Sequence, residues 1–282
     1  MWKSGVAALL GAVLLAGCGT EPISEKQDPL AGDVIDEAQL TQLLLSSSDP
    51  KSAITYFERA LAREPERADF RRNLAKSYVR AKRYPEAARL YQELLALEQD
   101  QATDILDYAY VSVRLDRWED AKALSSRLPP SLDTPRRYMM DALVADHDGD
   151  WDAADRHYAQ AEQLSANPSK ILNNWGVSLM SRGDLEEAEQ VFQRSVSYDS
   201  TVFSAKNNLA MSRGLRGDYR MPVVPLTSEE QAIISYNLGV IALRQGDTRT
   251  ARGLFAAAVD LHPRHYQQAV VQLAQLDSAI IR

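Results

Sequence analysis

The chain has 282 residues, of which 45% are hydrophobic and 25% charged, and its formal net charge is −7. This composition is that of an ordinary globular protein and excludes a disordered or fibrous chain. The negative charge, with no dense Lys/Arg tract, argues against nucleic acid as a partner. A single cysteine excludes an intramolecular disulfide, and that cysteine with four scattered histidines gives no recognisable metal site.

Residues 1–17 predict an export signal. Lys3 precedes an apolar run over residues 6–16, which is too short to cross a bilayer core of about 30 Å as a helix. The run leads into residues 15–18, Leu-Ala-Gly-Cys, which resemble the lipobox of bacterial lipoproteins. The resemblance implies cleavage before Cys18 and acylation of that cysteine. Gly19 directly after it implies transfer to the outer membrane, where the chain would face the periplasm. The alternative is a secretory signal with a chance cysteine.

Residues 18–33 are polar and contain two prolines, Pro22 and Pro29. We expect this segment to be a flexible tether between the lipid anchor and the folded body.

A repeat of about 34 residues runs through the remainder of the chain. Alanines recur at steps of 34, 34, 33 and 34 residues, and an aromatic residue stands four positions after most of them. The alanines are Ala53, Ala87, Ala121, Ala154 and Ala188, and the aromatic residues are Phe57, Tyr91, Tyr158 and Phe192. This pattern resembles the tetratricopeptide repeat, in which two antiparallel helices cross at small residues and an aromatic ring fills the next gap. The resemblance implies an all-α fold, a superhelical solenoid of antiparallel helix pairs.

We expect the repeats to occupy residues 34–265 and a closing helix to cover the end of the stack over residues 266–282. The repeat frames begin at Val34, Ala68, Ala102, Pro135, Ser169, Phe203 and Ala232.

Three frames depart from the pattern. The third has Ser125 at the aromatic position and a Pro-Pro pair that breaks its second helix, and the fourth has Asp141 where an apolar residue is expected. The sixth has two prolines within residues 221–226, which cannot form a regular helix, so an extended segment is expected there. Thr227 or Ser228 should then cap a new helix.

In such a solenoid the first helices of the pairs line a concave groove. Asparagines recur on these helices at two adjacent positions: Asn73, Asn174, Asn208 and Asn237 at one, and Asn173 and Asn207 at the other. Because an amide both donates and accepts hydrogen bonds, a ladder of amides suits the backbone of an extended partner peptide. The alternative is that the amides only tie neighbouring helices together.

A group of cations accompanies the amide of the second repeat. Arg72, Lys76 and Arg80 share one helical face with Asn73 and could hold a carboxylate or an acidic segment. The alternative is that they form a solvated helix face.

The residue constellations of common enzymes are missing from the sequence. It contains no His-Glu-x-x-His, Gly-x-Ser-x-Gly or phosphate-binding Gly-Lys-Ser/Thr motif. The cluster Asp146-His147-Asp148 is expected in the turn before Gly149, where polar residues are needed in any case. We therefore predict no catalytic residues, cofactor, metal or small-molecule substrate, and a protein as the partner.

The C-terminal half carries a more specific resemblance. Its motifs are residues 173–179 (Asn-Asn-Trp-Gly-Val-Ser-Leu), 207–210 (Asn-Asn-Leu-Ala), 236–247 and 262–266 (His-Pro-Arg-His-Tyr). Over residues 173–276 the chain resembles the TadD lipoproteins of the tight-adherence (Flp) pilus assembly system. The resemblance implies a non-catalytic outer-membrane scaffold that helps assemble or localise the secretin pore. Two alternatives are a type IV pilus secretin pilotin of the PilF/PilW kind and a regulator of an envelope (peptidoglycan) enzyme.

Overall fold

The computed structural model describes residues 36–47 and 49–280. These residues form fourteen α-helices and no β-strand, which confirms the all-α expectation. The chain divides into two compact units, Met1–Leu43 and Leu44–Arg282. The first unit contributes only the start of α1 to the described residues, and the other helices belong to the second unit.

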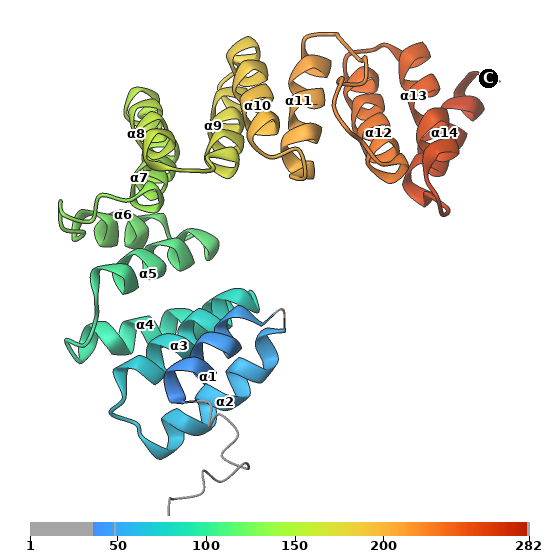
Figure 1. Ribbon diagram of the computed structural model, residues 1–282. Helices are drawn as coiled ribbons and strands as arrows, with labels where there is room; N and C mark the ends of the chain where they lie inside the picture. Colours follow the sequence, from blue (N-terminus) through green and yellow to red (C-terminus); the bar gives the residue numbers. More distant parts are fainter. Residues whose placement is uncertain (1–35, 48, 281–282) are drawn as a thin grey trace, which may run out of the picture. The chain divides into compact units, whose positions relative to one another are not determined.

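The helices follow one another closely along the chain (Figure 1). In order they are α1 (Glu37–Ser46), α2 (Pro50–Arg63), α3 (Ala68–Arg80), α4 (Tyr84–Ala96), α5 (Ala102–Arg114), α6 (Trp118–Ser126), α7 (Pro135–Asp148), α8 (Trp151–Leu164), α9 (Ser169–Ser181), α10 (Leu185–Tyr198), α11 (Phe203–Leu215), α12 (Ser228–Arg244), α13 (Thr248–Leu261) and α14 (Gln267–Ile280).

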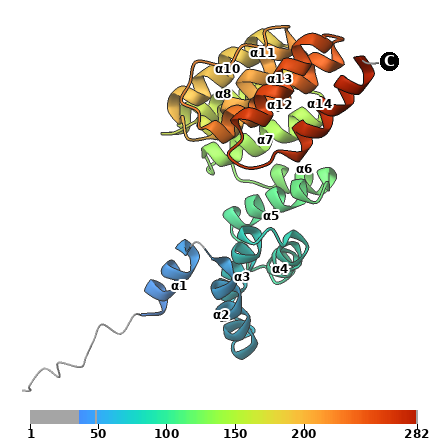
Figure 2. The ribbon, with the colours of Figure 1, turned by 90° about the vertical axis from the view of Figure 1, so that its right-hand side faces the viewer.

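Within the second unit, every helix from α2 onward packs on the next helix in the chain. The first helices of neighbouring repeats also touch, α3 with α5, α5 with α7 and α9 with α11. Five of the expected repeat frames begin at the residues where α3, α5, α7, α9 and α11 begin. Figure 1 shows the helices from α7 to α14 in a row, and in Figure 2, which is turned by 90°, they overlap one another. The second unit is therefore a tetratricopeptide-type solenoid.

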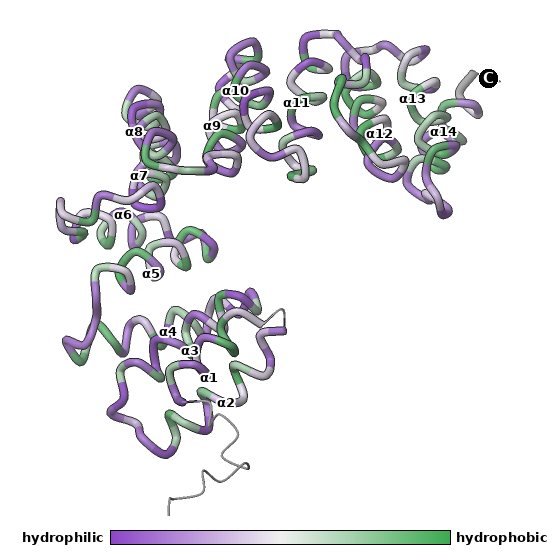
Figure 3. The backbone as a smooth tube through the Cα atoms, viewed as in Figure 1, coloured by the Kyte–Doolittle hydropathy of each residue, from purple (hydrophilic) through white to green (hydrophobic). Residues whose placement is uncertain are grey.

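Each helix has an apolar and a polar side, because it faces neighbours on one side and water on the other. Figure 3 shows this as an alternation of hydrophobic and hydrophilic residues along the helices, with no helix hydrophobic throughout. Accordingly, none of the helices in the described ranges is long and apolar enough to cross a membrane.

The two helices of a repeat approach closely at small residues. The recurring alanines on the second helices, Ala53, Ala87, Ala121, Ala154, Ala188 and Ala251, are all completely buried. On the first helix α9, a Cβ atom added to Gly176 would lie 2.5 Å from the ring of Phe192 on α10. The same crossing recurs further along, where a Cβ on Gly239 of α12 would lie 2.8 Å from the ring of Phe255 on α13. The aromatic ring thus occupies the space that a larger first-helix residue would need.

In the second to seventh repeats, the turn after the first helix contains a residue with a positive φ. Gly149 has a φ of 76° and ends α7, and the Asp150 that follows accepts a hydrogen bond from the Ala153 backbone N–H at the start of α8. The pair Gly246-Asp247 has the same two roles before α13, because glycine adopts a positive φ at low cost and aspartate caps helices well, whereas Asp184 makes no side-chain cap bond to α10. Lys82 and Asp116 hold the same position of earlier repeats with φ of 58° and 59°.

The sixth repeat lacks a second helix. Between α11 and α12 the chain is not helical, and α11 packs directly on α12, where a Cβ on Gly214 would lie 2.6 Å from Leu238. The intervening segment is fixed by Lys206 of α11, which is 4% exposed and whose Nζ lies 3.0 Å from the Pro225 carbonyl oxygen and 2.7 Å from the Glu230 carboxylate. Thr227 caps α12 in a capping box with Glu230. Residues 221–226 are therefore non-helical, as their prolines indicated.

The helix crossing makes a direct prediction for Gly176. Gly176→Ala should lower the free energy of unfolding by roughly 1–3 kcal/mol, because the new methyl group must displace the buried Phe192 ring. Gly253→Ala is a matched control, since it lies inside α13 with nothing within 4 Å of the added Cβ, and it should stabilise by about 1 kcal/mol. Urea denaturation of both variants measures the difference. If both substitutions stabilised the protein equally, the proposed crossing would be wrong.

Candidate protein-binding groove

The asparagines of the C-terminal repeats lie on first helices, and four of them form two bonded pairs. Asn208 Nδ2 on α11 donates to Asn173 Oδ1 on α9 at 3.1 Å, and Asn237 Nδ2 on α12 donates to Asn207 Oδ1 on α11 at 2.7 Å. Asn174 Nδ2 lies 3.7 Å from the sulfur of Met139 on α7. All these amides are half-buried. The structure therefore places five of the six predicted amides on the neighbouring helices α9, α11 and α12.

These bonds give the amides a structural role between repeats. Each pair joins the first helix of one repeat to the first helix of the next, as in the alternative raised from the sequence. The pairs do not use every polar atom: Asn208 Oδ1, Asn237 Oδ1 and Asn173 Nδ2 have no partner among the described residues. These atoms remain able to bond a peptide backbone.

Apolar side chains accompany the amides on the same helices. Val177 on α9 is 40% exposed and Leu215 on α11 is 38% exposed, while Met180 and Met211 are half-buried. Methionine side chains adapt their shape to varied partners. We define the C-terminal groove by these four residues and by Asn173, Asn174, Asn207, Asn208 and Asn237. Its chemistry is apolar with amides, and it suits a polypeptide better than a charged small molecule.

The predicted cation cluster on α3 does not form one surface for a partner. The side chain of Arg72 is 12% exposed, and its Nε lies 2.7 Å from the completely buried carboxylate of Asp104 on α5. Its Nη2 donates to the Gln99 carbonyl oxygen at 3.0 Å. Arg72 thus joins two repeats, which corrects the expectation that it offers its charge to a partner.

The other residues of that cluster have separate environments. Arg80 donates to the carbonyl oxygens of Leu44 and Ser47, near the end of α1. Lys76 and the side chain of Asn73 have no hydrogen-bond partner among the described residues. Asn73 is not connected to the amides of the C-terminal groove. The lipidation site predicted at Cys18 lies outside the described residues.

Asp146 has a role that the sequence did not reveal. It lies in the last turn of α7 and not in the turn before Gly149 where the sequence placed it. Its carboxylate accepts hydrogen bonds from the Tyr158 hydroxyl on α8 at 2.8 Å and from the Ser178 hydroxyl on α9 at 2.6 Å. Burial raises the pKa of this carboxyl. Asp146 is therefore a link between the fourth and fifth repeats, and only the packing of the three consecutive helices α7, α8 and α9 shows it.

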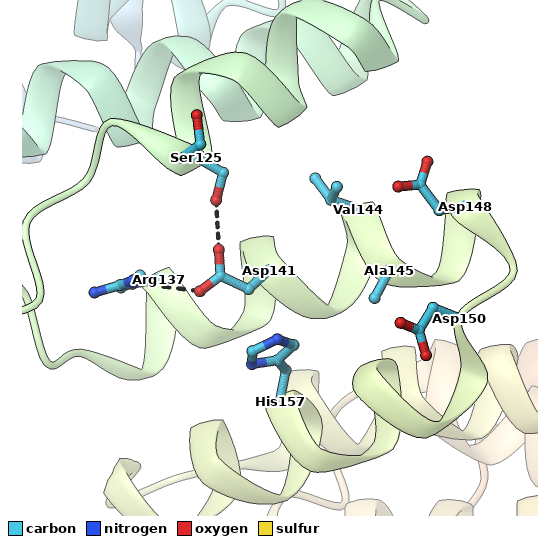
Figure 4. Close-up of a pocket in the computed structure, with 9 residues that line it drawn as sticks. Ser125, Arg137, Asp141, Val144, Ala145, Asp148, Asp150 and His157 are labelled. Carbon is cyan, nitrogen blue, oxygen red and sulfur yellow. Dashed lines mark hydrogen bonds and ion pairs between the residues drawn. The ribbon is translucent and has the colours of Figure 1, made fainter.

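A second concavity lies where the third repeat meets the fourth. It is an open cleft of about 370 Å³ between α6, α7 and α8, with Asp141, Val144 and His157 among the residues that line it. Figure 4 shows Ser125 of α6 bonded to Asp141 of α7 at one end of this cleft. Both residues are departures that the sequence had singled out, but their bond to each other was not foreseen. No group of three or more metal-ligating side chains occurs here or elsewhere in residues 36–47 and 49–280.

The buried ion pair of Arg72 makes a stability prediction. Arg72→Met should lower the free energy of unfolding by about 3–5 kcal/mol, because it leaves the Asp104 carboxylate buried without its partner. Arg252→Met is a matched control, since the Arg252–Asp277 pair is exposed and should contribute no more than about 1 kcal/mol. Chemical denaturation compares the two variants. Equal losses would show that Asp104 is not sealed from solvent as the structure indicates.

Family models described as tetratricopeptide repeat match three parts of the chain, residues 44–105, 140–201 and 228–274. The two stretches between these matches, 106–139 and 202–227, contain most of the third repeat with its shortened α6 and the sixth repeat with its non-helical segment. The matches and the gaps between them therefore agree with the regular and irregular parts of the solenoid.

Solved structures with the same fold cover most of the chain at low sequence identity. A tetratricopeptide repeat protein from Parabacteroides merdae is 16% identical, with a TM-score of 0.55 over 85% of this chain and 96% of its own. PilW, a type IV pilus biogenesis factor, is 17% identical, with a TM-score of 0.54 over 73% of this chain and 98% of its own. The Cut9–Hcn1 hetero-tetramer of the APC/C is 15% identical, with a TM-score of 0.59 over 88% of this chain and 50% of its own. At these identities the similarity shows the fold alone.

A curated relative matches a shorter part. The photosystem I assembly protein Ycf3 of Rippkaea orientalis is 33% identical over 84 residues. That match covers 29% of this chain and 49% of the relative, so the chain spans about half the length of the protein it matches.

Proposed function

Because the chain belongs to the tetratricopeptide-repeat family, we propose that it is a non-catalytic scaffold that binds a segment of another protein along the C-terminal groove. The observation that carries this proposal is the row of amides and half-exposed apolar side chains on α9, α11 and α12. Apolar side chains supply contact area, and the unpaired amide atoms can bond a peptide backbone.

The proposed setting is the outer membrane, with an anchor on Cys18 and the repeats in the periplasm. The Leu-Ala-Gly-Cys sequence at residues 15–18 supports the anchor. The polar segment at residues 18–33 is the proposed tether between the anchor and the repeats. The proposed system is Flp pilus assembly with the secretin as partner, supported by the TadD-like motifs between residues 173 and 276.

A type IV pilus role is the second candidate, and one observation favours it. PilW, which shares this fold over 98% of its own length, is a type IV pilus biogenesis factor. The two candidates make the same use of the groove and differ in the identity of the bound protein. A regulator of a peptidoglycan enzyme remains a third candidate.

The anchor is tested by metabolic labelling. Cells that express the protein should incorporate labelled palmitate into it, and the label should follow the protein into the outer-membrane fraction. Cys18→Ser should abolish both, because the thiol is the acyl acceptor. Retention of the label in Cys18→Ser would rule out the lipobox interpretation.

The partner is tested by photo-cross-linking in intact cells. A photoreactive residue at Val177, in the groove, should attach the Flp secretin, whereas one at Tyr198, at the end of the second helix α10, should not. Both sites are exposed, so accessibility alone does not distinguish them. An adduct with a type IV pilus component would replace the Flp proposal by the second candidate, and one with a murein synthase by the third.

The same cross-linking experiment can be repeated with substitutions of the groove amides. Asn174→Ala combined with Asn208→Ala should reduce the adduct at Val177 and leave the helical circular dichroism spectrum unchanged. Loss of the Asn208–Asn173 bond should cost only about 1 kcal/mol of stability. An undiminished adduct would exclude the amides from partner binding.

A further inference from the structure

The junction between the third and fourth repeats is built differently from its neighbours. At the preceding junction, Tyr91 on α4 stacks on Tyr108 on α5 with ring centroids 6.2 Å apart. At the following junction, Tyr158 on α8 stacks on Trp175 on α9 with centroids 6.1 Å apart. The corresponding residues between them are Ser125 and Asp141, joined by a hydrogen bond from the serine hydroxyl to the carboxylate. Two aromatic rings are therefore replaced by two small polar groups.

The missing rings account for the cleft. A ring at each of these positions would fill the space between α6 and α7, as it does at the neighbouring junctions. The space left open is about 370 Å³, large enough for a planar group of the size of a side chain. Its floor is partly apolar, formed by Val144 and Ala145 of α7, and His157 of α8 stands at its side (Figure 4).

The lining carries an excess of negative charge. Asp141, Asp148 and Asp150 line the cleft together with one cation, Arg137. Arg137 pairs with Asp141 at 3.3 Å, and Lys122 of α6 pairs with Asp148. Three carboxylates and these two cations leave a formal charge of −1.

The uncompensated charge is located at one end of the cleft. Asp148 uses Oδ2 for Lys122, and Asp150 uses Oδ1 to cap α8. Their other oxygens have no partner among the described residues. Figure 4 places these two carboxylates beyond Val144 and Ala145, at the end opposite Arg137. A guest that lies on the apolar floor would thus meet two carboxylate oxygens at its tip.

We propose that this cleft binds an arginine side chain of a partner protein. The guanidinium is planar and can occupy the place of a missing ring, and it presents several donors to carboxylates in a fixed geometry. The methylene stem would lie on Val144 and Ala145, and the single positive charge would balance the lining. A neutral aromatic side chain would fill the space but desolvate Asp148 and Asp150 without compensation.

The cleft is separate from the C-terminal groove. It is lined by the second helices α6 and α8 as well as by α7, whereas the groove is formed by first helices. The arginine-binding proposal therefore does not depend on which partner binds along the C-terminal groove.

The test uses the histidine signals of the full-length protein in detergent. The chain has four histidines, so His157 can be assigned by substitution and His262 and His265 serve as internal references. Titration with the peptide acetyl-Gly-Arg-Gly-amide should shift the His157 imidazole resonances saturably and leave the reference signals in place. The isosteric citrulline peptide should bind at least about tenfold more weakly, because it lacks the charge.

Matched variants decide between the cleft and non-specific attraction. Asp148→Asn with Asp150→Asn should abolish the arginine response while keeping the helix cap, since asparagine caps as well as aspartate. Asp152→Asn, an exposed carboxylate of α8 outside the cleft, should leave it unchanged. Ser125→Phe with Asp141→Leu should fill the cleft and also abolish the response. An absent or non-saturable shift, an equal response to citrulline, or an equal loss in Asp152→Asn would overturn the proposal.

Discussion

The solenoid depends on the contact between a small residue on the first helix of a repeat and an aromatic ring on the second. At Gly176 the ring of Phe192 lies so close that not even a methyl group fits between them. This approach fixes the separation of the two helices and thereby the position of the next pair. Amide side chains are short, so the bonds from Asn208 to Asn173 and from Asn237 to Asn207 form only because neighbouring first helices are held this close.

The repeats differ in how they are joined, and these differences carry the functional information. The junctions on either side of the third-to-fourth one use stacked rings, whose polar atoms reach carboxylates within the protein, as the Tyr158 hydroxyl reaches Asp146. The junction at Ser125 and Asp141 uses a hydroxyl–carboxylate bond and leaves a cleft, and the sixth repeat replaces a helix by a non-helical segment fixed through Lys206. Departures from an otherwise consistent pattern are the places where a function is most expected.

Polar side chains serve both the fold and the proposed binding surfaces. Arg72 pairs with a buried carboxylate and both oxygens of Asp146 accept hydrogen bonds, and through these contacts the two residues connect successive repeats. The groove amides and the carboxylates at the end of the cleft are satisfied only in part. Unpaired polar atoms are tolerated here because these side chains are exposed or half-buried. Water can hydrogen-bond to the unpaired atoms until a partner displaces it. The distinction between internal link and binding surface therefore lies in the unpaired atoms, which residue type alone does not reveal.

The sequence by itself determined the all-α class, the 34-residue period and the starts of α3, α5, α7, α9 and α11, because a fixed spacing of small and aromatic residues is typical of packed helix pairs. It also indicated the break at residues 221–226, since proline acts locally on the backbone. Only the tertiary structure decided that Arg72 is an internal link, that the asparagines bond in pairs, and that Ser125 and Asp141 face each other. Each of these contacts joins residues 16 to 35 positions apart, and whether two such side chains meet depends on how successive helix pairs are stacked.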